Sequence, residues 1–258
     1  MGGTMARFAA QGHRVVLVTA TGGEAGLAAS SITAGDSLGE VRARELHRSA
    51  AILGCERVVQ FGYPDSGLHG EAAPAGSFSQ LGVEPIASRL AQLLEEEGAD
   101  VLTGYDAAGG YGHPDHVQVH RVARRAAELA RTPILLEATV DRLALQRALR
   151  LLGRLRPASA DFAVARFDEL YAHPSEITHR LDVGRYIRQK RAAMRAHASQ
   201  STADGADRGL AWMLRLPAPL FRLAFRREWF IETRLIETRS GGSGPASRGP
   251  WSGWSGES

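Results

Sequence analysis

Hydrophobic positions along the chain form two alternating kinds of pattern. Short, nearly continuous apolar runs rich in β-branched residues predict buried strands over 14–21, 56–62, 99–105 and 132–140. Between these runs, apolar positions recur at helical spacing over 37–54, 82–97 and 114–130. This alternation predicts an α/β fold with a doubly wound, mostly parallel, Rossmann-like sheet that has helices on both faces.

The two ends of the chain depart from this alternation. Residues 2–11 read as a helix that Gly12 ends, so the strand that normally opens a doubly wound sheet is missing from the pattern. Residues 239–258 are rich in Gly, Ser and Pro and poor in aliphatic residues, which is typical of a flexible tail. We therefore expect one domain over 1–238, followed by this tail.

Composition and charge exclude several classes of function. The net charge is only +3, and the arginines are interspersed with acidic residues on helix faces, which argues against nucleic-acid binding. A run of about 18 uncharged apolar residues is absent, so we expect neither a membrane span nor a signal peptide. Cys55 is the single cysteine and cannot form an internal disulfide, which fits a reducing cytoplasm. Assembly into a homo-oligomer stays open.

The most informative segment is GGYGHPDHVQVH, residues 109–120, which follows the strand predicted at 99–105. Ligands of doubly wound sheets bind beyond the carboxyl ends of the strands. Pro114 suits the first turn of a helix, which puts His113 at or near its N-cap. His116 and His120 are four residues apart and share a face, as two ligands of one metal ion do.

Asp115 lies beside His113, and a carboxylate that accepts from an imidazole N–H fixes the tautomer of the ring. These histidines and this aspartate are residue types that suit metal-assisted hydrolysis. The alternative is a solvated helix start that happens to be rich in histidine, because His and Asp favour helix N-termini. His120, one turn further along, is the weakest member of the set.

A second glycine-rich segment, TATGGEAG at 19–26, raises the alternative of nucleotide binding. Gly22, Gly23 and Gly26 do not reproduce the GxGxxG spacing, and no predicted helix follows at once. The segment therefore argues weakly for a nucleotide.

Several ordered motifs resemble one known family. GYGHPDHVQVH, GGTMARFAAQGHRVVLVTATGGEAG, EVRARELHRSAAILG, GYPDSGL and KRAAMRAHASQ together resemble the LmbE/PIG-L family of zinc-dependent N-acetylglucosaminyl deacetylases. The actinobacterial branch, with the mycothiol-pathway deacetylase and mycothiol conjugate amidase, is the most similar. The resemblance covers most of residues 2–200. It implies a zinc cofactor, a small amino-sugar conjugate as substrate, and hydrolysis of its N-acyl amide.

The resemblance also implies roles for individual residues. His116 would be a zinc ligand, and His113 would be the imidazolium that stabilises the tetrahedral oxyanion. Asp115 would orient His113, and Tyr111 would swing in as a polarising group or proton donor. Three further residues would bind sugar hydroxyls: Arg42, Asp65 and Glu24.

Other interpretations of these last residues stay open. Arg42 could form a helix-surface ion pair with Glu45, and Asp65 could cap a turn. For the whole chain, the alternative is a non-catalytic sugar-binding homologue that has lost the metal.

One departure from the family pattern concerns the metal site. Family members carry a His-Pro-Asp-Asp-Glu segment just before the Gly-Gly-Thr helix, and it supplies the other two ligands and the catalytic base. The printed sequence starts at that helix, at Gly2. Met1 is then either an internal methionine or the start of a gene that lacks the segment. We expect the upstream reading frame to encode an apolar strand that ends in His-Pro-Asp-Asp.

The printed chain is therefore expected to bind zinc weakly and to hydrolyse little, because a catalytic zinc site usually needs three protein ligands. Zinc per chain should be measured for this chain and for one extended upstream. We expect tight, stoichiometric zinc in the extended chain alone. Stoichiometric zinc in the printed chain would contradict this and would direct the search for ligands to His69, His173 and His197.

Overall fold

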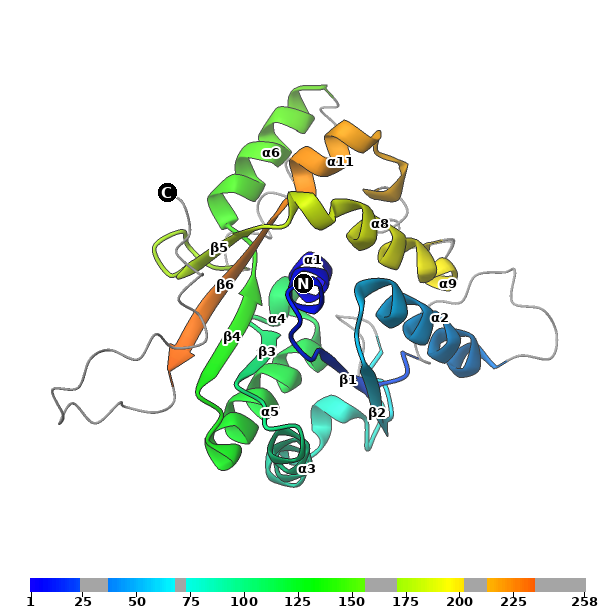
Figure 1. The fold of residues 1–258 in the computed structure, drawn as a ribbon, viewed down its shortest axis with the longest axis vertical. Helices are drawn as coiled ribbons and strands as arrows, with labels where there is room; N and C mark the ends of the chain where they lie inside the picture. Colours follow the sequence, from blue (N-terminus) through cyan, green and yellow to red (C-terminus); the bar gives the residue numbers. More distant parts are fainter. Residues whose placement is uncertain (24–36, 68–72, 156–170, 202–212, 235–258) are drawn as a thin grey trace, which may run out of the picture.

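The computed structural model describes residues 1–23, 37–67, 73–155, 171–201 and 213–234. Glu24 and the tail predicted at 239–258 therefore lie outside the described residues. The main helices are α1 (Gly2–Ala10), α2 (Leu38–Leu53), α3 (Val83–Glu96), α5 (Pro114–Ala130), α6 (Arg142–Leu155), α8 (Ile187–Ala196) and α11 (Ala218–Phe225). The strands are β1 (Val16–Thr21), β2 (Arg57–Tyr63), β3 (Val101–Tyr105), β4 (Ile134–Thr139), β5 (His179–Asp182) and β6 (Arg227–Arg234) (Figure 1). Shorter helices are α4 (Gly109–Gly112), α9 (Ala198–Ser201), η1 (Phe78–Gln80) and η3 (Gly184–Tyr186).

Every helix and strand predicted from the hydrophobic pattern is confirmed within a few residues, because local signals define the ends. The Ser37 side chain accepts from the Glu40 amide, and the Glu40 side chain accepts in return from the Ser37 amide, which is a capping box. Gly54 ends the same helix in the left-handed conformation. His113 caps the N-terminus of α5, with Pro114 in its first turn.

The strands form two sheets. β1 and β2 pair in parallel as one sheet, and the second sheet has the order β3-β4-β6-β5. The prediction of a mostly parallel sheet is wrong for this second sheet, because β6 runs antiparallel to both β4 and β5. Antiparallel strands at the side of an α/β sheet are common, since a returning chain can pair there without a crossover.

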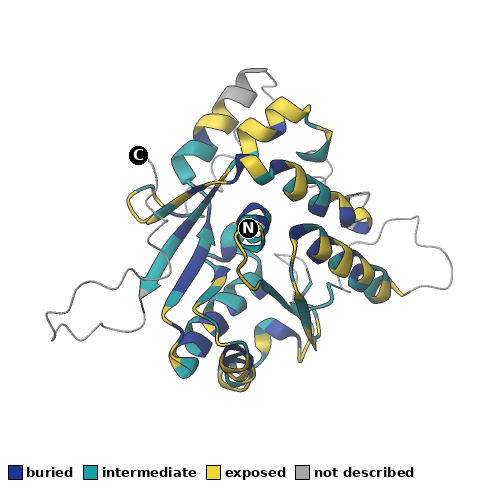
Figure 2. Ribbon diagram, viewed as in Figure 1, coloured by how far each residue is buried: buried dark blue, intermediate teal, exposed yellow. Residues whose placement is uncertain are grey.

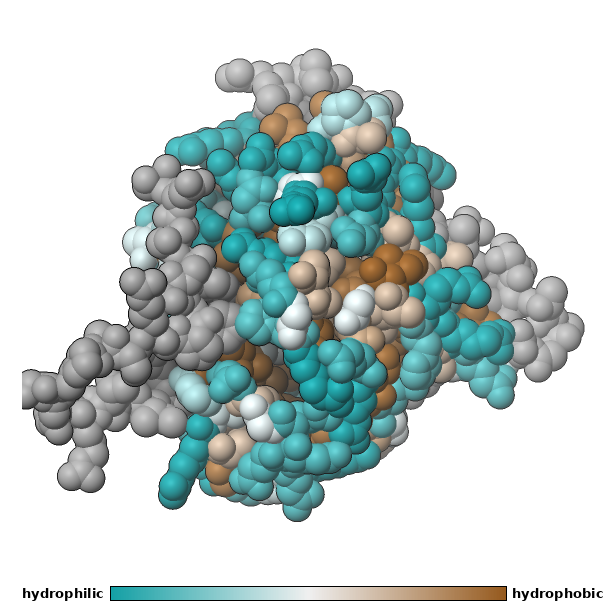
Figure 3. Space-filling view, viewed as in Figure 1, coloured by the Kyte–Doolittle hydropathy of each residue, from teal (hydrophilic) through white to brown (hydrophobic). Residues whose placement is uncertain are grey.

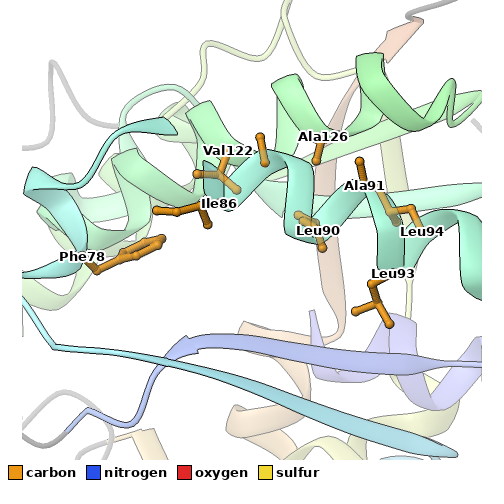
Figure 4. Close-up of a cluster of buried hydrophobic side chains, with 9 residues drawn as sticks. Phe78, Ile86, Leu90, Ala91, Leu93, Leu94, Val122 and Ala126 are labelled. Atoms are coloured by element: carbon orange, nitrogen blue, oxygen red, sulfur yellow. The ribbon is translucent and has the colours of Figure 1, made fainter. Parts of the chain in front are cut away.

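The two sheets share one layer of helices. α3 and α5 pack against each other, and a single hydrophobic cluster between them takes in Val18 and Val59 from the first sheet and Leu102 from the second. Figure 4 shows the side chains of this cluster, with Val122 and Ala126 of α5 beside those of α3. Buried residues accordingly lie on the inner sides of these helices and along β4 (Figure 2).

A second group of helices lies on the other side of the strands. α1, α2 and α8 pack together there, around a cluster that includes Ala6, Leu53 and Ala193 (Figure 1). Among the coloured residues of the face in Figure 3, hydrophilic ones predominate, with smaller apolar patches between them. None of the described helices is long and apolar enough to cross a membrane.

The start of α1 is bound to the opposite end of the chain. The buried Glu228 carboxylate of β6 accepts from the amides of Gly3 and Thr4, from the Thr4 hydroxyl and from Lys190. Burial alone would raise the pKa of Glu228, but the N-terminal ammonium, Lys190 and Thr4 hold the pKa of this carboxyl well below its ordinary value. The contact joins α1, α8 and β6 into one unit.

Candidate active site

The site begins at the carboxyl end of β3, where Tyr105 is the last strand residue. β3 and α5 approach closely, because a Cβ on Gly104 would lie 3.2 Å from the Cβ of Ala123. The Tyr105 ring stacks on the His116 ring, with centroids 3.9 Å apart and planes 6° apart. Burial, and then the nearby Tyr111, raise the pKa of Tyr105 to about 12, so its hydroxyl is neutral.

The turn from β3 into α5 depends on glycine. Gly109 has a φ of +64°, and a Cβ there would lie 2.7 Å from the backbone nitrogen of Val117. No other residue can bring the backbone so close to the first turn of α5. The Gly109 carbonyl accepts from Nδ1 of His116 at 3.2 Å, which directs Nε2 of this ring away from the backbone.

Three predicted site residues meet at this turn. The ring centroids of His113 and His116 are 4.8 Å apart, and the Tyr111 ring lies 5.9 Å from His113 and 5.2 Å from His116. Tyr111 is 51% exposed, so about half of this residue is accessible to a bound ligand. Burial, and then the neighbouring His113, lower the pKa of His116 to about 4. His116 is therefore a neutral imidazole at physiological pH, the form that binds metals.

Asp115 joins this group through its backbone rather than through its carboxylate. Its amide donates to Nδ1 of His113 at 3.2 Å, so the ring of neutral His113 carries its proton on Nε2. The buried carboxylate instead accepts from the Ser66 amide at 3.3 Å through Oδ2. Oδ1 of Asp115 is buried and has no hydrogen-bond partner among the described residues.

The three predicted sugar-binding residues differ in position. Asp65 accepts from the Gly67 amide at 2.8 Å, so it does cap a turn, and its neighbour Ser66 brings that loop to Asp115. Arg42 is buried and reaches the loop after β1, where a Cβ on Gly23 would lie 2.6 Å from its Nη1 atom. Glu24 lies outside the described residues.

Glu45, the residue with which Arg42 could alternatively pair, has a partner in another segment. Glu45 is buried, and its carboxylate accepts from the amide and the hydroxyl of Ser199, both at 2.7 Å.

Comparison with known proteins identifies the family. Residues 1–127, which include the whole histidine cluster, match the family described as PIG-L, GlcNAc-PI de-N-acetylase. A Streptomyces griseus protein named 1D-myo-inositol 2-acetamido-2-deoxy-alpha-D-glucopyranoside deacetylase is 37% identical over an alignment of 229 positions. The match covers 79% of this chain and 71% of the relative. The chain belongs to the PIG-L/LmbE family. The resemblance seen in the sequence motifs is thereby confirmed.

Solved structures show the same fold as this PIG-L family chain. An antimicrobial pseudoaglycone deacetylase superposes with a TM-score of 0.56 at 18% identity, covering 92% of both chains. The zinc inhibited form of a teicoplanin deacetylase has a TM-score of 0.54 at 18% identity and covers 91% of this chain and 92% of its own. The α/β class predicted from the sequence is therefore confirmed at the level of the LmbE-like fold.

One of the described residues has the chemistry of a metal ligand. His116 fits as one ligand, because its ring is neutral and its Nδ1 is held by a carbonyl. His120 lies one turn further along α5, and its Nδ1 lies 3.1 Å from the Glu137 carboxylate and 3.3 Å from the Tyr105 carbonyl. Among the described residues, no group of three His, Cys, Asp or Glu side chains is placed to hold a metal ion.

Sequence reasoning missed three residues that border the site: Tyr105, Asp106 and Tyr171. Tyr105 and Asp106 stand at the carboxyl end of a predicted strand, so their position alone could have marked them. Tyr171 comes from a segment without a periodic pattern, and nothing in the sequence relates it to residue 110.

Replacement of Gly109 by Ala should damage the site by forcing α5 away from the turn. We expect Gly109→Ala to lower the free energy of unfolding by about 1–3 kcal/mol more than Gly62→Ala does, because the new methyl group overlaps α5. Gly62 is the matched control, since its φ is +73° but a Cβ there meets nothing within 4 Å. Urea unfolding of both variants measures the difference, and equal losses would show that only the left-handed backbone matters.

Proposed function

We propose that this chain hydrolyses the N-acetyl amide of a glucosamine-containing conjugate, with a GlcNAc-inositol as its substrate. The observation that carries the proposal is the identity of 37% with a deacetylase named for that substrate, over 79% of the chain. The geometry supports it, because His113, His116 and Tyr111 gather beyond the carboxyl end of β3.

The chain's own residues suit stabilisation of a charged intermediate. When water attacks an amide carbonyl, negative charge develops on the carbonyl oxygen, and the leaving nitrogen needs a proton. His113 can donate from Nε2 to that oxygen, because its Nδ1 is occupied by the Asp115 amide. The exposed Tyr111 hydroxyl is the second donor we assign, and Asp115 orients His113 from the helix N-terminus.

Zinc is the cofactor we propose, with His116 as one ligand. Support comes from the neutral His116 ring and from the zinc inhibited form of the structurally similar teicoplanin deacetylase. The described residues do not complete a zinc site.

Arg42, Asp65 and Glu24 are the residues we propose to bind the sugar hydroxyls. Ser66 supports this for Asp65, because its contact with Asp115 brings the loop after β2 beside the histidine pair. For Arg42 the support is its position against the loop after β1, at the carboxyl end of that strand.

We further propose that the two sheets are parts of one doubly wound, Rossmann-like sheet. The shared hydrophobic cluster beneath β1, β2 and β3 supports this arrangement, because one helical layer covers all three strands.

The second candidate function is a non-catalytic sugar-binding homologue. The observation in its favour is the incomplete ligand set among the described residues. The two candidates differ in metal content and in turnover.

The deciding experiment is a deacetylase assay with N-acetylglucosaminyl-inositol, with release of free amine as the readout. The printed chain and an upstream-extended chain should both be tested, with bound zinc measured in each. Amine release in either chain supports the amide hydrolase. Substrate binding without amine release or zinc in both chains would favour the sugar-binding homologue.

Replacement of His113 should affect turnover far more than substrate affinity, because a group that stabilises the oxyanion acts mainly in the transition state. We expect His113→Ala to lower kcat on the order of 100-fold with little change in KM. His120→Gln is the matched control, since His120 lies on the same helix and is held by Glu137. A loss confined to KM would show that His113 only binds substrate.

A further inference from the structure

Asp106, the first residue after β3, is a buried carboxylate that the reaction as described does not use. It is 4% exposed, and both of its oxygens are occupied. Oδ1 accepts from the Gly110 amide at 2.8 Å, and Oδ2 accepts from the Thr139 hydroxyl at 2.6 Å. Burial of a carboxylate is costly unless such donors satisfy it. The two hydrogen bonds of Asp106 are therefore strongly favoured over conformations in which the carboxylate loses them.

The first contact defines the backbone just before Tyr111. Gly110 has a φ of +67° and a ψ of −100°, a conformation that side chains other than glycine rarely adopt. Glycine is also the residue type with the greatest backbone freedom when no contact restrains it. The Asp106 carboxylate holds this amide, and the direction of the next side chain, Tyr111, follows from it.

The second contact extends to a distant segment. The Thr139 hydroxyl donates to Asp106 and accepts from the Ala172 amide at 3.1 Å. The residue before Ala172 is Tyr171, whose φ of +67° is unusual for an aromatic residue. Tyr171 lies against the same turn, since a Cβ on Gly110 would be 3.8 Å from its ring.

The electrostatics of Tyr171 agree with this placement. Burial, and then the nearby Asp106 and Tyr111, raise the pKa of Tyr171 to about 12. The tyrosine hydroxyl is therefore neutral beside the Asp106 carboxylate, and Asp106, Tyr111 and Tyr171 form one neighbourhood.

We propose that Asp106 is a positioning residue for Tyr111: it holds the Gly110 amide and, through Thr139, fixes the turn so that Tyr111 faces the His113 and His116 pair. The proposal rests on the proposed deacetylase function only for its effect on turnover. The position of the turn itself is independent of what the site does.

The kinetic test is a double-mutant cycle in the full chain, in its active upstream-extended form if the printed chain is inactive. Asp106→Ala should lower kcat about 10- to 100-fold in the wild-type background, because small misplacements of a reacting group are costly. In the Tyr111→Phe background the same change should cost less than about threefold, since the hydroxyl it positions is already gone. Equal losses in both backgrounds, or a loss confined to KM, would overturn the proposal.

A second pair of variants tests the same hydrogen bond in case the Asp106→Ala protein does not fold. Thr139→Val removes the hydroxyl and keeps the shape, whereas Thr139→Ser keeps the hydroxyl and is the matched control. We expect Thr139→Val to repeat the pattern of the cycle and Thr139→Ser to stay near wild type. Loss in both Thr139 variants would point to packing instead.

Hydrogen exchange separates this proposal from the proposed function. Amides of the peptide over 107–112 should exchange faster in Asp106→Ala and Thr139→Val than in wild type or Thr139→Ser, because the Gly110 amide loses its acceptor or its support. This readout needs no substrate and no turnover. Altered exchange, together with inactivity of the wild type in both the printed and the upstream-extended chain, refutes only the deacetylase function. Unchanged exchange overturns the role of Asp106.

Discussion

The close approach of Gly109 to the first turn of α5 is the constraint on which the site depends. With the Gly109 carbonyl in reach of Nδ1 of His116, the turn fixes this ring and sets His113 at the N-cap. The same approach leaves no room for a side chain, because a Cβ would overlap Val117. Backbone geometry thus places the two histidines at this turn, and the Tyr105 ring packs on His116.

Hydrogen bonds then connect this turn to the ends of two other strands. Ser66, after β2, donates to Asp115, and Thr139, the last residue of β4, donates to Asp106. Both hydrogen bonds are buried. Water cannot replace either partner there at low cost. Loops from three strands therefore form one polar unit at the carboxyl ends, the side where α/β folds bind their ligands.

The sequence predicts the elements around this unit well and the unit itself only in part. The strands and helices up to residue 140 carry strong periodic patterns and clear caps, such as Ser37 with Glu40, so their existence and ends follow from local rules. The hydrophobic pattern did not predict β6, because this stretch follows an apolar helix without a turn signal between them. In the structure, Phe230 and its neighbours alternate in burial as a strand does.

Contacts between distant segments lie beyond such rules. The His113, Asp115 and His116 pattern is local, so its position at a helix start could be predicted. The contacts of Asp106 with Thr139, and of Ala172 with Thr139, join residues 33 positions apart. Nothing in a one-dimensional pattern reports that pairing.

Two histidines three positions apart can differ in chemical role because their surroundings differ. His116 lies between the Tyr105 ring and the Gly109 carbonyl, where burial lowers its pKa to about 4 and keeps a lone pair available on Nε2. His113 accepts a backbone N–H on Nδ1, which leaves the proton of its neutral ring on the opposite nitrogen. We propose that one ring is thereby prepared to give electrons to a cation and the other to give a hydrogen bond to an anion. The proposed amide hydrolysis needs both, and the turn between β3 and α5 places the two rings 4.8 Å apart.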